Sequence, residues 1–180
     1  MLPEYFQLKK YDISCRLVTI EDSEFILSLR TDSKLSRFLH PTENDIEQQK
    51  KWMKDYFDRN KNGLEYYFIY SKDNIPFGLN RIYHIKDDHC EGGSWLCKKG
   101  TTPQDAIATL LIIREIIFEL LNLKCEFFDV QIGNHQVKKI HLMMGAEYIG
   151  TTDNQENFRI TKDNFDIGKL KFKKLLKFKD

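Results

Sequence analysis

The spacing of apolar residues changes along the chain and predicts where helices and strands lie. A short strand over 16–20 leads into two helices, whose apolar residues recur every three or four positions. From residue 66 the pattern becomes β-rich, with strands expected over 66–70, 76–85 and 90–97 and short polar links between them. Three consecutive strands with such links predict an antiparallel meander.

The second half of the chain alternates helices and strands. Thr102 has the side chain of a helix N-cap, and Pro103 suits the first helical position. The stretch 106–121 is apolar nearly all round, which predicts a helix buried against a sheet. Gly145 is expected to terminate the helix predicted over 136–144. The remaining elements should follow in the order strand, helix, strand, strand, over 127–132, 136–144, 147–151 and 157–161.

The C-terminal segment is rich in lysine. Residues 169–180 contain six lysines, and apolar and basic residues largely alternate there, which favours a strand over a helix. We therefore expect one domain over 1–166, followed over 167–180 by a basic tail or an edge strand that its lysines keep from aggregating. A segment that binds a membrane surface is the less favoured alternative.

Composition and charge narrow the class of protein. The 180 residues suit one domain, and a net charge of +1 gives no overall attraction to nucleic acid or to acidic membranes. The N-terminus lacks the pattern of a signal peptide, and no apolar run reaches the roughly 20 residues of a transmembrane segment. The four cysteines are widely spaced, without a metal-binding or disulfide pattern. We expect a cytoplasmic protein with reduced thiols, no metal and no nucleic-acid partner.

One motif in the second half carries a family resemblance. The residues that fit the spacing of the motif are Asn134, Val137, Ile140, Gly145 and Ala146. Together with the order of elements over 15–161, the motif resembles the GNAT superfamily of N-acetyltransferases. The resemblance implies an α+β fold, in which one domain has a mixed, mostly antiparallel central sheet of about six or seven strands with helices on both faces.

The same resemblance implies acetyl-CoA as co-substrate. In the family a glycine-rich turn holds the CoA pyrophosphate at a helix N-terminus, whereas the turn at 98–102 has a single glycine. The preceding strand, with Gly92 and Gly93, is expected to splay from its neighbour through a bulge and to pair with the pantetheine arm. Leu96 and Cys97 would then present N–H groups to the thioester carbonyl. The residues expected to bind acetyl-CoA are Leu96, Cys97, Lys98, Gly100, Thr101, Thr102 and Asn134.

Three residues are candidates for proton transfer. His141 stands seven residues after Asn134, where the family usually has tyrosine, and we expect it to protonate or hydrogen-bond the departing CoA thiolate. Its alternative role is that of an ordinary helix residue facing the sheet. Glu91 and His84, on strands expected to be neighbours, are the candidate general bases for the incoming ammonium. A solvent-exposed place on the sheet is the commoner fate of such side chains.

The acceptor site is expected in the first half of the chain. Its candidate residues are His40, Trp52, Arg81 and Tyr83. The opening sequence is similar to a branch that acetylates either ribosomal-protein N-termini or amino groups of nucleotide-linked sugars. Aromatic walls favour a small-molecule amine, an amino sugar, with protein N-termini as the alternative. A non-catalytic CoA-binding or interaction module is a further alternative, because the turn is short and the tyrosine is missing. A homodimer is left open.

Overall fold

The structure is a computed structural model that describes residues 1–178. Its strands are β1 (Gln7–Lys10), β2 (Ile13–Leu17), β3 (Tyr66–Lys72), β4 (Ile75–Lys86), β5 (His89–Cys97), β6 (Cys125–Gln131), β7 (Glu147–Thr152) and β8 (Gln155–Thr161). Its helices are α1 (Ser23–Thr31), α2 (Ile46–Lys61), α3 (Pro103–Glu115), α4 (His135–Met143) and α5 (Lys162–Leu176), with a 3₁₀ turn before α1 (Ile20–Asp22) and a π-helical turn after α3 (Ile116–Leu120). The order of elements agrees with the prediction except at the two ends of the chain.

Within residues 1–178, eight strands form one sheet in the order β1-β2-β3-β4-β5-β6-β8-β7. Neighbouring strands are antiparallel except for β5 and β6, which are parallel. The predicted α+β class and the mixed, mostly antiparallel sheet are therefore confirmed. The sheet has one strand more than expected because residues 7–10, whose largely polar sequence carries no strand signal, pair with β2 at the edge.

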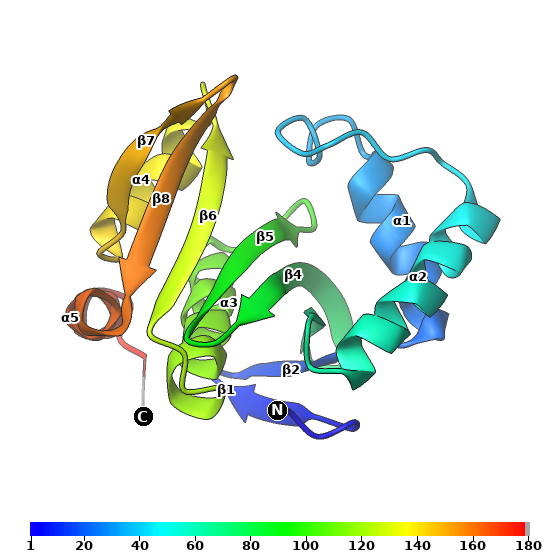
Figure 1. Ribbon diagram of the computed structural model, residues 1–180, viewed down its shortest axis with the longest axis horizontal. Helices are drawn as coiled ribbons and strands as arrows, with labels where there is room; N and C mark the ends of the chain where they lie inside the picture. The colour runs from blue at the N-terminus through cyan, green and yellow to red at the C-terminus, as the bar shows by residue number, and fades with distance from the viewer. Residues whose placement is uncertain (179–180) are drawn as a thin grey trace.

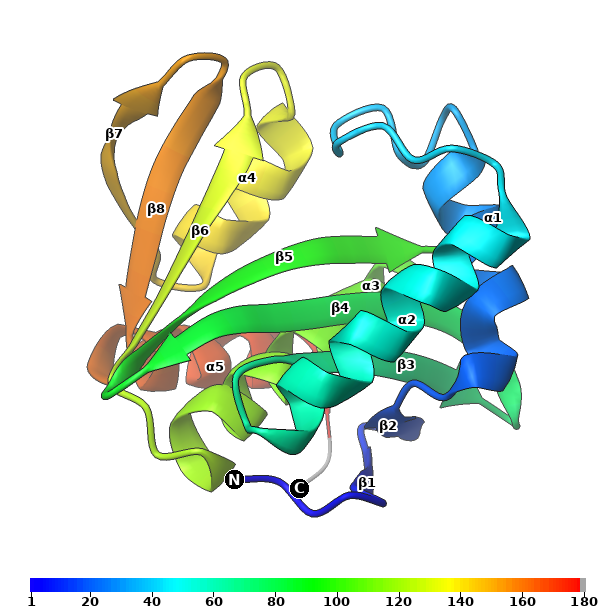
Figure 2. The same cartoon turned by 45° about the vertical axis from the view of Figure 1, so that its right-hand side comes forward.

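The strands β5 and β6 pair over only a few residues and then separate. Their parallel ladder joins 89–91 to 125–127, and beyond it the two strands splay apart (Figure 1 and Figure 2). On its other side β5 stays paired with β4 through a bulge, in which Ser94 and Trp95 lie opposite the single residue Asn80. Ser94 has a left-handed backbone, with φ of 54°. The expected splay and bulge are present, and the bulge falls just after the two glycines.

Helices cover both faces of the sheet, as predicted (Figure 2). α1 and α2 pack on one face, and α3 packs on the other. β3 is buried on both faces, because Phe68 and Tyr70 point into the core with α3 whereas Tyr67 and Ile69 point into the core with α1 and α2. The last eight residues of α3, 108–115, are all buried, which confirms the prediction for this helix. This packing on both faces holds β4 and β5 in place beside the gap between β5 and β6.

Residues 167–176 are helical, so the expected edge strand or tail is wrong for this part of the C-terminal segment. α5 begins before this segment and continues to Leu176. Its buried residues Phe165, Gly168 and Phe172 are three and four positions apart, which puts them on one helical face. Most of the lysines lie on the rest of the helix surface, so their near alternation does not reflect a strand. Residues 179 and 180 lie outside the described residues.

Gly168 lets α5 pack closely against the end of α4. A Cβ atom at this position would overlap the backbone carbonyl of Met144. We expect Gly168→Ala to lower the free energy of unfolding by about 1–3 kcal/mol, although alanine favours helix formation, because the backbone must shift. Urea unfolding followed by circular dichroism measures the change. Lys171→Ala, exposed on the same helix, should stay within about 0.5 kcal/mol of the parent. Equal midpoints for both variants would contradict the expectation.

Candidate active site

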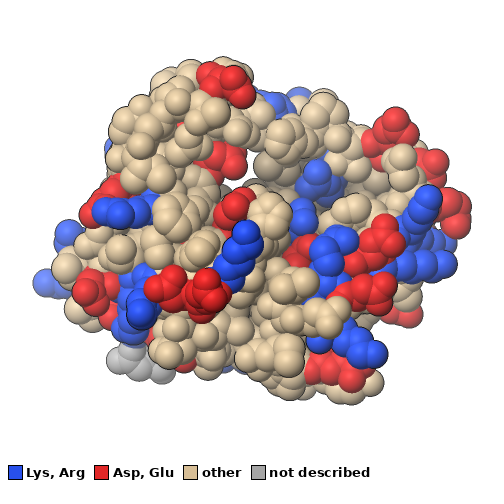
Figure 3. All heavy atoms as spheres, in the orientation of Figure 1, with Lys and Arg blue, Asp and Glu red and all other residues tan. Residues whose placement is uncertain are grey.

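A cavity of about 560 Å³, the main cavity, lies in the gap between β5 and β6. Its walls also include β4, the beginning of α3, α4 and the segment 34–40 after α1. Figure 3 shows the molecule hollowed here, between the side formed by α1 and α2 and the side formed by β6 and β8. The predicted site residues that lie in the wall are His40, Arg81, Tyr83, Leu96, Cys97, Thr101, Asn134 and His141.

The other predicted site residues lie around the main cavity. Trp52 lines a neighbouring pocket. His84 Nδ1 lies 3.0 Å from Glu91 Oε1. The side chains are 67% and 45% exposed, respectively, and both lie outside the wall of the cavity. Three more of the predicted residues, Lys98, Gly100 and Thr102, belong to the turn at one end of the cavity. The His84–Glu91 pair thus occupies the solvent-exposed place on the sheet that was its alternative interpretation.

The turn at 98–102 leads into the N-terminus of α3. Gly100 has φ of 91°, and a Cβ atom there would meet no other atom within 4 Å. Thr101 donates to the Lys98 carbonyl from its backbone N–H at 3.1 Å and from its hydroxyl at 2.7 Å. The next residue, Thr102, caps α3 with its side chain, and the positive end of the helix dipole lies here. The Thr101 donors are thus used within the turn, and the positive end of α3 is the feature that suits the diphosphate of CoA, despite the single glycine.

The free edge of β5 offers backbone groups to a ligand. Lys98 donates its N–H to the Phe77 carbonyl at 2.6 Å, and N–H groups alternate in direction along a strand. The Leu96 N–H therefore points toward β4, whereas the Cys97 N–H points into the gap, where a thioester carbonyl can accept it. Burial raises the pKa of the Cys97 thiol to about 12, which disfavours the thiolate that a nucleophilic role would need.

Asn134 lies where β6 gives way to α4. Its side chain makes no capping hydrogen bond to the helix, and the residue lines the main cavity. The sequence left two roles open for this amide, helix capping or binding of the pantetheine arm. Because the capping bond is absent in the described structure, the amide is available to polar atoms of a ligand.

A buried ionic cluster lies behind the same wall. Arg114 of α3 is fully buried, and its Nε donates to Glu126 of β6 at 2.8 Å. Its Nη2 lies 2.9 Å from Nδ1 of His141. Because a guanidinium only donates, Nδ1 must accept, and the proton of the imidazole is on Nε2. Burial and the charge of Arg114 lower the pKa of His141 well below its usual value, so the ring is neutral.

Comparison with known proteins agrees with this geometry. Residues 13–147 match the acetyltransferase (GNAT) domain family. The chain belongs to the GNAT family of acetyltransferases. Enzymes of this family use acetyl-CoA, which suits the turn before α3 and the free edge of β5. The sequence gives no significant match to the curated proteins with which it was compared.

Several solved structures share the fold. Apo FdhC, described as a nucleotide-linked sugar GNAT, has a TM-score of 0.85 and 32% sequence identity, over 96% of this chain and 99% of that one. A ribosomal-protein-S5-alanine acetyltransferase from Vibrio fischeri has a TM-score of 0.75 and 13% identity, over 89% and 98%. A spermidine N-acetyltransferase from Vibrio cholerae has a TM-score of 0.72 and 14% identity, over 86% and 98%. The last two likenesses are of fold alone.

A GNAT enzyme benefits from a group that takes a proton from the incoming ammonium. Asp129 of β6 lies in the wall of the main cavity. Although its side chain reaches solvent, desolvation by the surrounding walls raises the pKa of Asp129, an effect that His40 opposes and Glu91 reinforces. Asp129 is itself exposed to solvent, but it lies in the wall of the cavity, which His84 and Glu91 do not, and it is therefore the better placed candidate base.

The sequence interpretation missed Arg114, Glu126 and Asp129. Their partners come from distant segments, so no local spacing connects them. One signal was present, since Arg114 interrupts a helix that is otherwise predicted to be buried all round. A fully buried arginine needs a carboxylate or another acceptor, which predicts a buried partner without identifying it.

Three further observations concern membrane spanning, metal binding and the cysteines. Within residues 1–178, every helix is too short or too polar to traverse a bilayer. The same residues bring no three His, Cys, Asp or Glu side chains together as a metal site would. The four cysteines are all free thiols.

Proposed function

We propose that this enzyme transfers the acetyl group of acetyl-CoA to an amino group on a sugar linked to a nucleotide. The observation that carries the proposal is the charge of the acceptor-side wall of the main cavity. Figure 3 has lysine and arginine atoms on this side of the hollow. The basic residues of the wall are Arg30, Lys34, Arg37 and Arg81. Such a wall favours an acceptor with negative charge, such as a nucleotide sugar, and disfavours a polyamine.

Similarity to FdhC supports the same acceptor class. That protein is described as acting on a nucleotide-linked sugar, and 32% of the aligned residues are identical over nearly the whole of both chains. The ribosomal-protein acetyltransferase, which represents the alternative acceptor, shares only 13% of its residues with this chain. Charge and similarity therefore favour the amino sugar over a protein N-terminus.

The side chains around the cavity suit direct acetyl transfer. Acetyl-CoA supplies an activated thioester, whose carbonyl carbon the free amine attacks. Asp129 would take the proton that the ammonium gives up, and the Cys97 N–H would bond the carbonyl oxygen as negative charge develops there. His141 would donate its Nε2–H to the sulfur as CoA leaves. The ammonium loses two protons in all. The first goes to Asp129 before the attack and passes from there to solvent. The second leaves the nitrogen as the tetrahedral intermediate collapses and reaches the CoA thiolate through solvent, while His141 stays neutral as a hydrogen-bond donor.

A panel of acceptors tests the proposal. We expect acetyl transfer to a thymidine- or uridine-diphosphate-linked amino sugar, with kcat/KM for the free amino sugar at least roughly tenfold lower because the anionic part no longer contributes binding. Spermidine and an alanine-starting peptide should react more slowly still. Release of free CoA thiol, followed by a thiol reagent, measures each rate. A rise in melting temperature with acetyl-CoA serves as the control that the co-substrate binds. Faster transfer to the peptide or to spermidine would overturn the proposal.

A further inference from the structure

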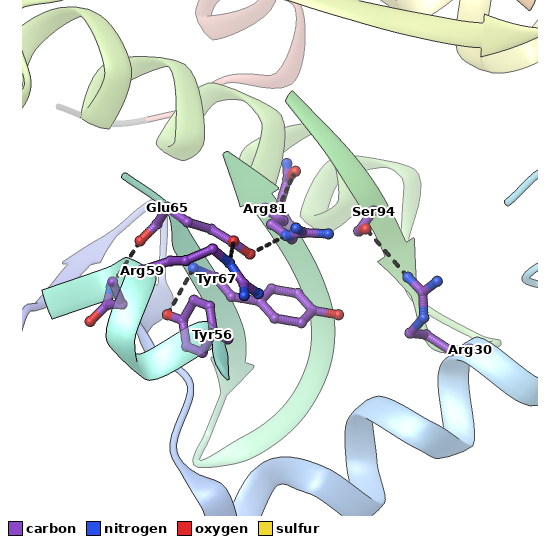
Figure 4. Close-up of polar contacts among 9 residues, drawn as sticks. Arg30, Tyr56, Arg59, Glu65, Tyr67, Arg81 and Ser94 are labelled. Atoms are coloured by element: carbon purple, nitrogen blue, oxygen red, sulfur yellow. Dashed lines mark hydrogen bonds and ion pairs between the residues drawn. The ribbon is translucent and has the colours of Figure 1, made fainter. Parts of the chain in front are cut away.

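A second cavity, the side pocket, adjoins the acceptor side of the main cavity. It measures about 290 Å³ and lies among α1, α2, β3, β4 and the segment 41–43. The residues common to both walls are Arg30, Arg81 and Ser94, so the two spaces meet along these side chains. Figure 4 shows all three residues together with Tyr67. An acceptor in the main cavity can therefore extend a substituent into the side pocket.

Two buried polar side chains in the wall of the side pocket have a hydrogen-bond donor that is not used. Gln49 of α2 is 7% exposed and Tyr67 of β3 is 2% exposed, and both line the pocket. Nε2 of Gln49 makes no hydrogen bond within the described residues. The Tyr67 hydroxyl lies beside the Arg30 guanidinium, which can only donate to it, so the O–H of Tyr67 itself has no acceptor among those residues. Figure 4 shows the Tyr67 hydroxyl reaching toward the space between Arg81 and Arg30. Because nearly all buried polar groups in proteins are hydrogen-bonded, these two donors indicate a ligand with acceptor atoms.

The side pocket also has an excess of positive charge. Arg30 donates to the hydroxyls of Thr42, at 2.9 Å, and Ser94, at 3.3 Å, and lies beside the Tyr67 hydroxyl. It makes no ion pair within residues 1–178. Arg81 pairs with the buried Glu65. In the wall itself, the one carboxylate among the described residues is that of Glu43, which is exposed to solvent. The interior of the pocket therefore lacks a counter-ion for Arg30.

Arg81 shares the Glu65 carboxylate with a second guanidinium. Arg59 binds the other oxygen of the same carboxylate at 2.6 Å (Figure 4). One buried carboxylate thus serves two guanidiniums, which leaves the Arg81 side with net positive charge. The Arg81 guanidinium also lies over the rings of Trp52, at 5.1 Å, and Tyr83, at 4.6 Å. Those contacts fix its orientation at the boundary between the two cavities.

We infer that the side pocket binds an oxyanion of the acceptor, with Arg30 and Arg81 supplying charge and Gln49 and Tyr67 supplying hydrogen bonds. The inference rests on the proposed function, for which a phosphate of the nucleotide is the oxyanion. A carboxylate offers the same acceptor chemistry from another class of acceptor. Guanidinium groups bind both oxyanions strongly, since charge-assisted hydrogen bonds are roughly twice as strong as neutral ones.

Calorimetric titration tests the inference without the acetyl-transfer reaction. The protein is first saturated with CoA, so that a diphosphate cannot enter the CoA site. Thymidine diphosphate should then bind, and thymidine should bind at least roughly tenfold more weakly because it has no oxyanion. Arg30→Met and Gln49→Leu should each weaken thymidine diphosphate binding roughly tenfold or more. Lys54→Met, which removes an exposed charge of α2 outside the wall, is the matched control and should leave binding unchanged.

The outcomes separate this inference from the proposed function. If galacturonate binds in place of the diphosphate, with the same dependence on Arg30 and Gln49, the pocket is an oxyanion site that takes a carboxylate. If neither probe binds, or if binding is insensitive to both substitutions while CoA still binds, the inference is overturned even where amino-sugar acetylation is observed. Diphosphate binding that depends on Arg30, in a protein that acetylates no amino sugar, would uphold the pocket and overturn the proposed function.

Discussion

Replacing Arg114 with methionine should lower the free energy of unfolding by about 3–5 kcal/mol. The guanidinium is fully buried and neutralises Glu126, which is 5% exposed, so its removal leaves a carboxylate uncompensated in the core. It also removes the donor to His141 Nδ1. Equilibrium unfolding in urea at pH 7 measures the loss.

The pH dependence of that loss identifies its cause. Without Arg114, the ionised carboxylate of Glu126 would remain in the core with no counter-ion. The penalty applies to the ionised side chain and is absent from the neutral acid. The destabilisation should therefore shrink toward acidic pH. A loss that does not change with pH would indicate a packing defect.

Two further variants serve as controls for the Arg114 substitution. Arg114→Met combined with Glu126→Met should recover most of the stability, because an apolar pair replaces the ion pair without stranding a charge. Arg59→Met should cost about 1 kcal/mol or less, since Arg59 is partly exposed and Glu65 keeps Arg81 as partner. If Arg59→Met and Arg114→Met have equal effects, burial of the carboxylate without a partner is not the cause.

Much of the fold could be predicted because its signals are local. The Thr102 cap and Pro103 locate the beginning of α3, and the polar links between strands give the order of the meander. The Asn134 motif likewise depends on spacing within one helix. Each of these features involves residues within a few positions of one another, so the sequence contains all the information that they need.

The rest depends on contacts between distant segments. Apolar and basic residues alternate in the lysine-rich end as they would in a strand. The segment is nevertheless helical, and its Gly168 packs against the backbone of Met144. The wall of the side pocket likewise combines Gln49 with Tyr67 and Arg30, which no short motif connects. Tertiary packing decided these cases over local propensity.

The role of His141 changes most between sequence and structure. Its spacing from Asn134 suggested a general acid. The structure buries it beside Arg114, which lowers the pKa of His141 well below its usual value. The His141 ring is therefore seldom protonated near neutral pH. The neutral ring can still donate a hydrogen bond through Nε2. We therefore expect a fixed hydrogen-bond donor to the leaving thiolate in the place where the family usually has tyrosine.

His141→Phe should lower kcat roughly 10²-fold, at the low end of the effects of a lost transition-state donor, with little change in the dissociation constant of acetyl-CoA. His141→Gln should retain more activity, since an amide can accept from Arg114 and donate to the cavity but cannot act as an acid. His141→Tyr should also keep much of the activity. Stopped-assay rates and calorimetry give the two constants. Equal rates for His, Gln and Phe would make position 141 structural.

The pH profile of kcat/KM distinguishes a neutral donor from an acid. If a protonated His141 were required, activity would fall as the pH rises through its lowered pKa. We expect the reverse, a rise with pH as Asp129, whose pKa is raised above its usual value, loses its proton and becomes able to accept one. His141→Phe should lower the whole profile and keep this acid limb. Asp129→Asn should remove the limb, because an amide does not titrate. A limb that disappears with His141 and survives without Asp129 would show that the proton transfer belongs to the imidazole after all.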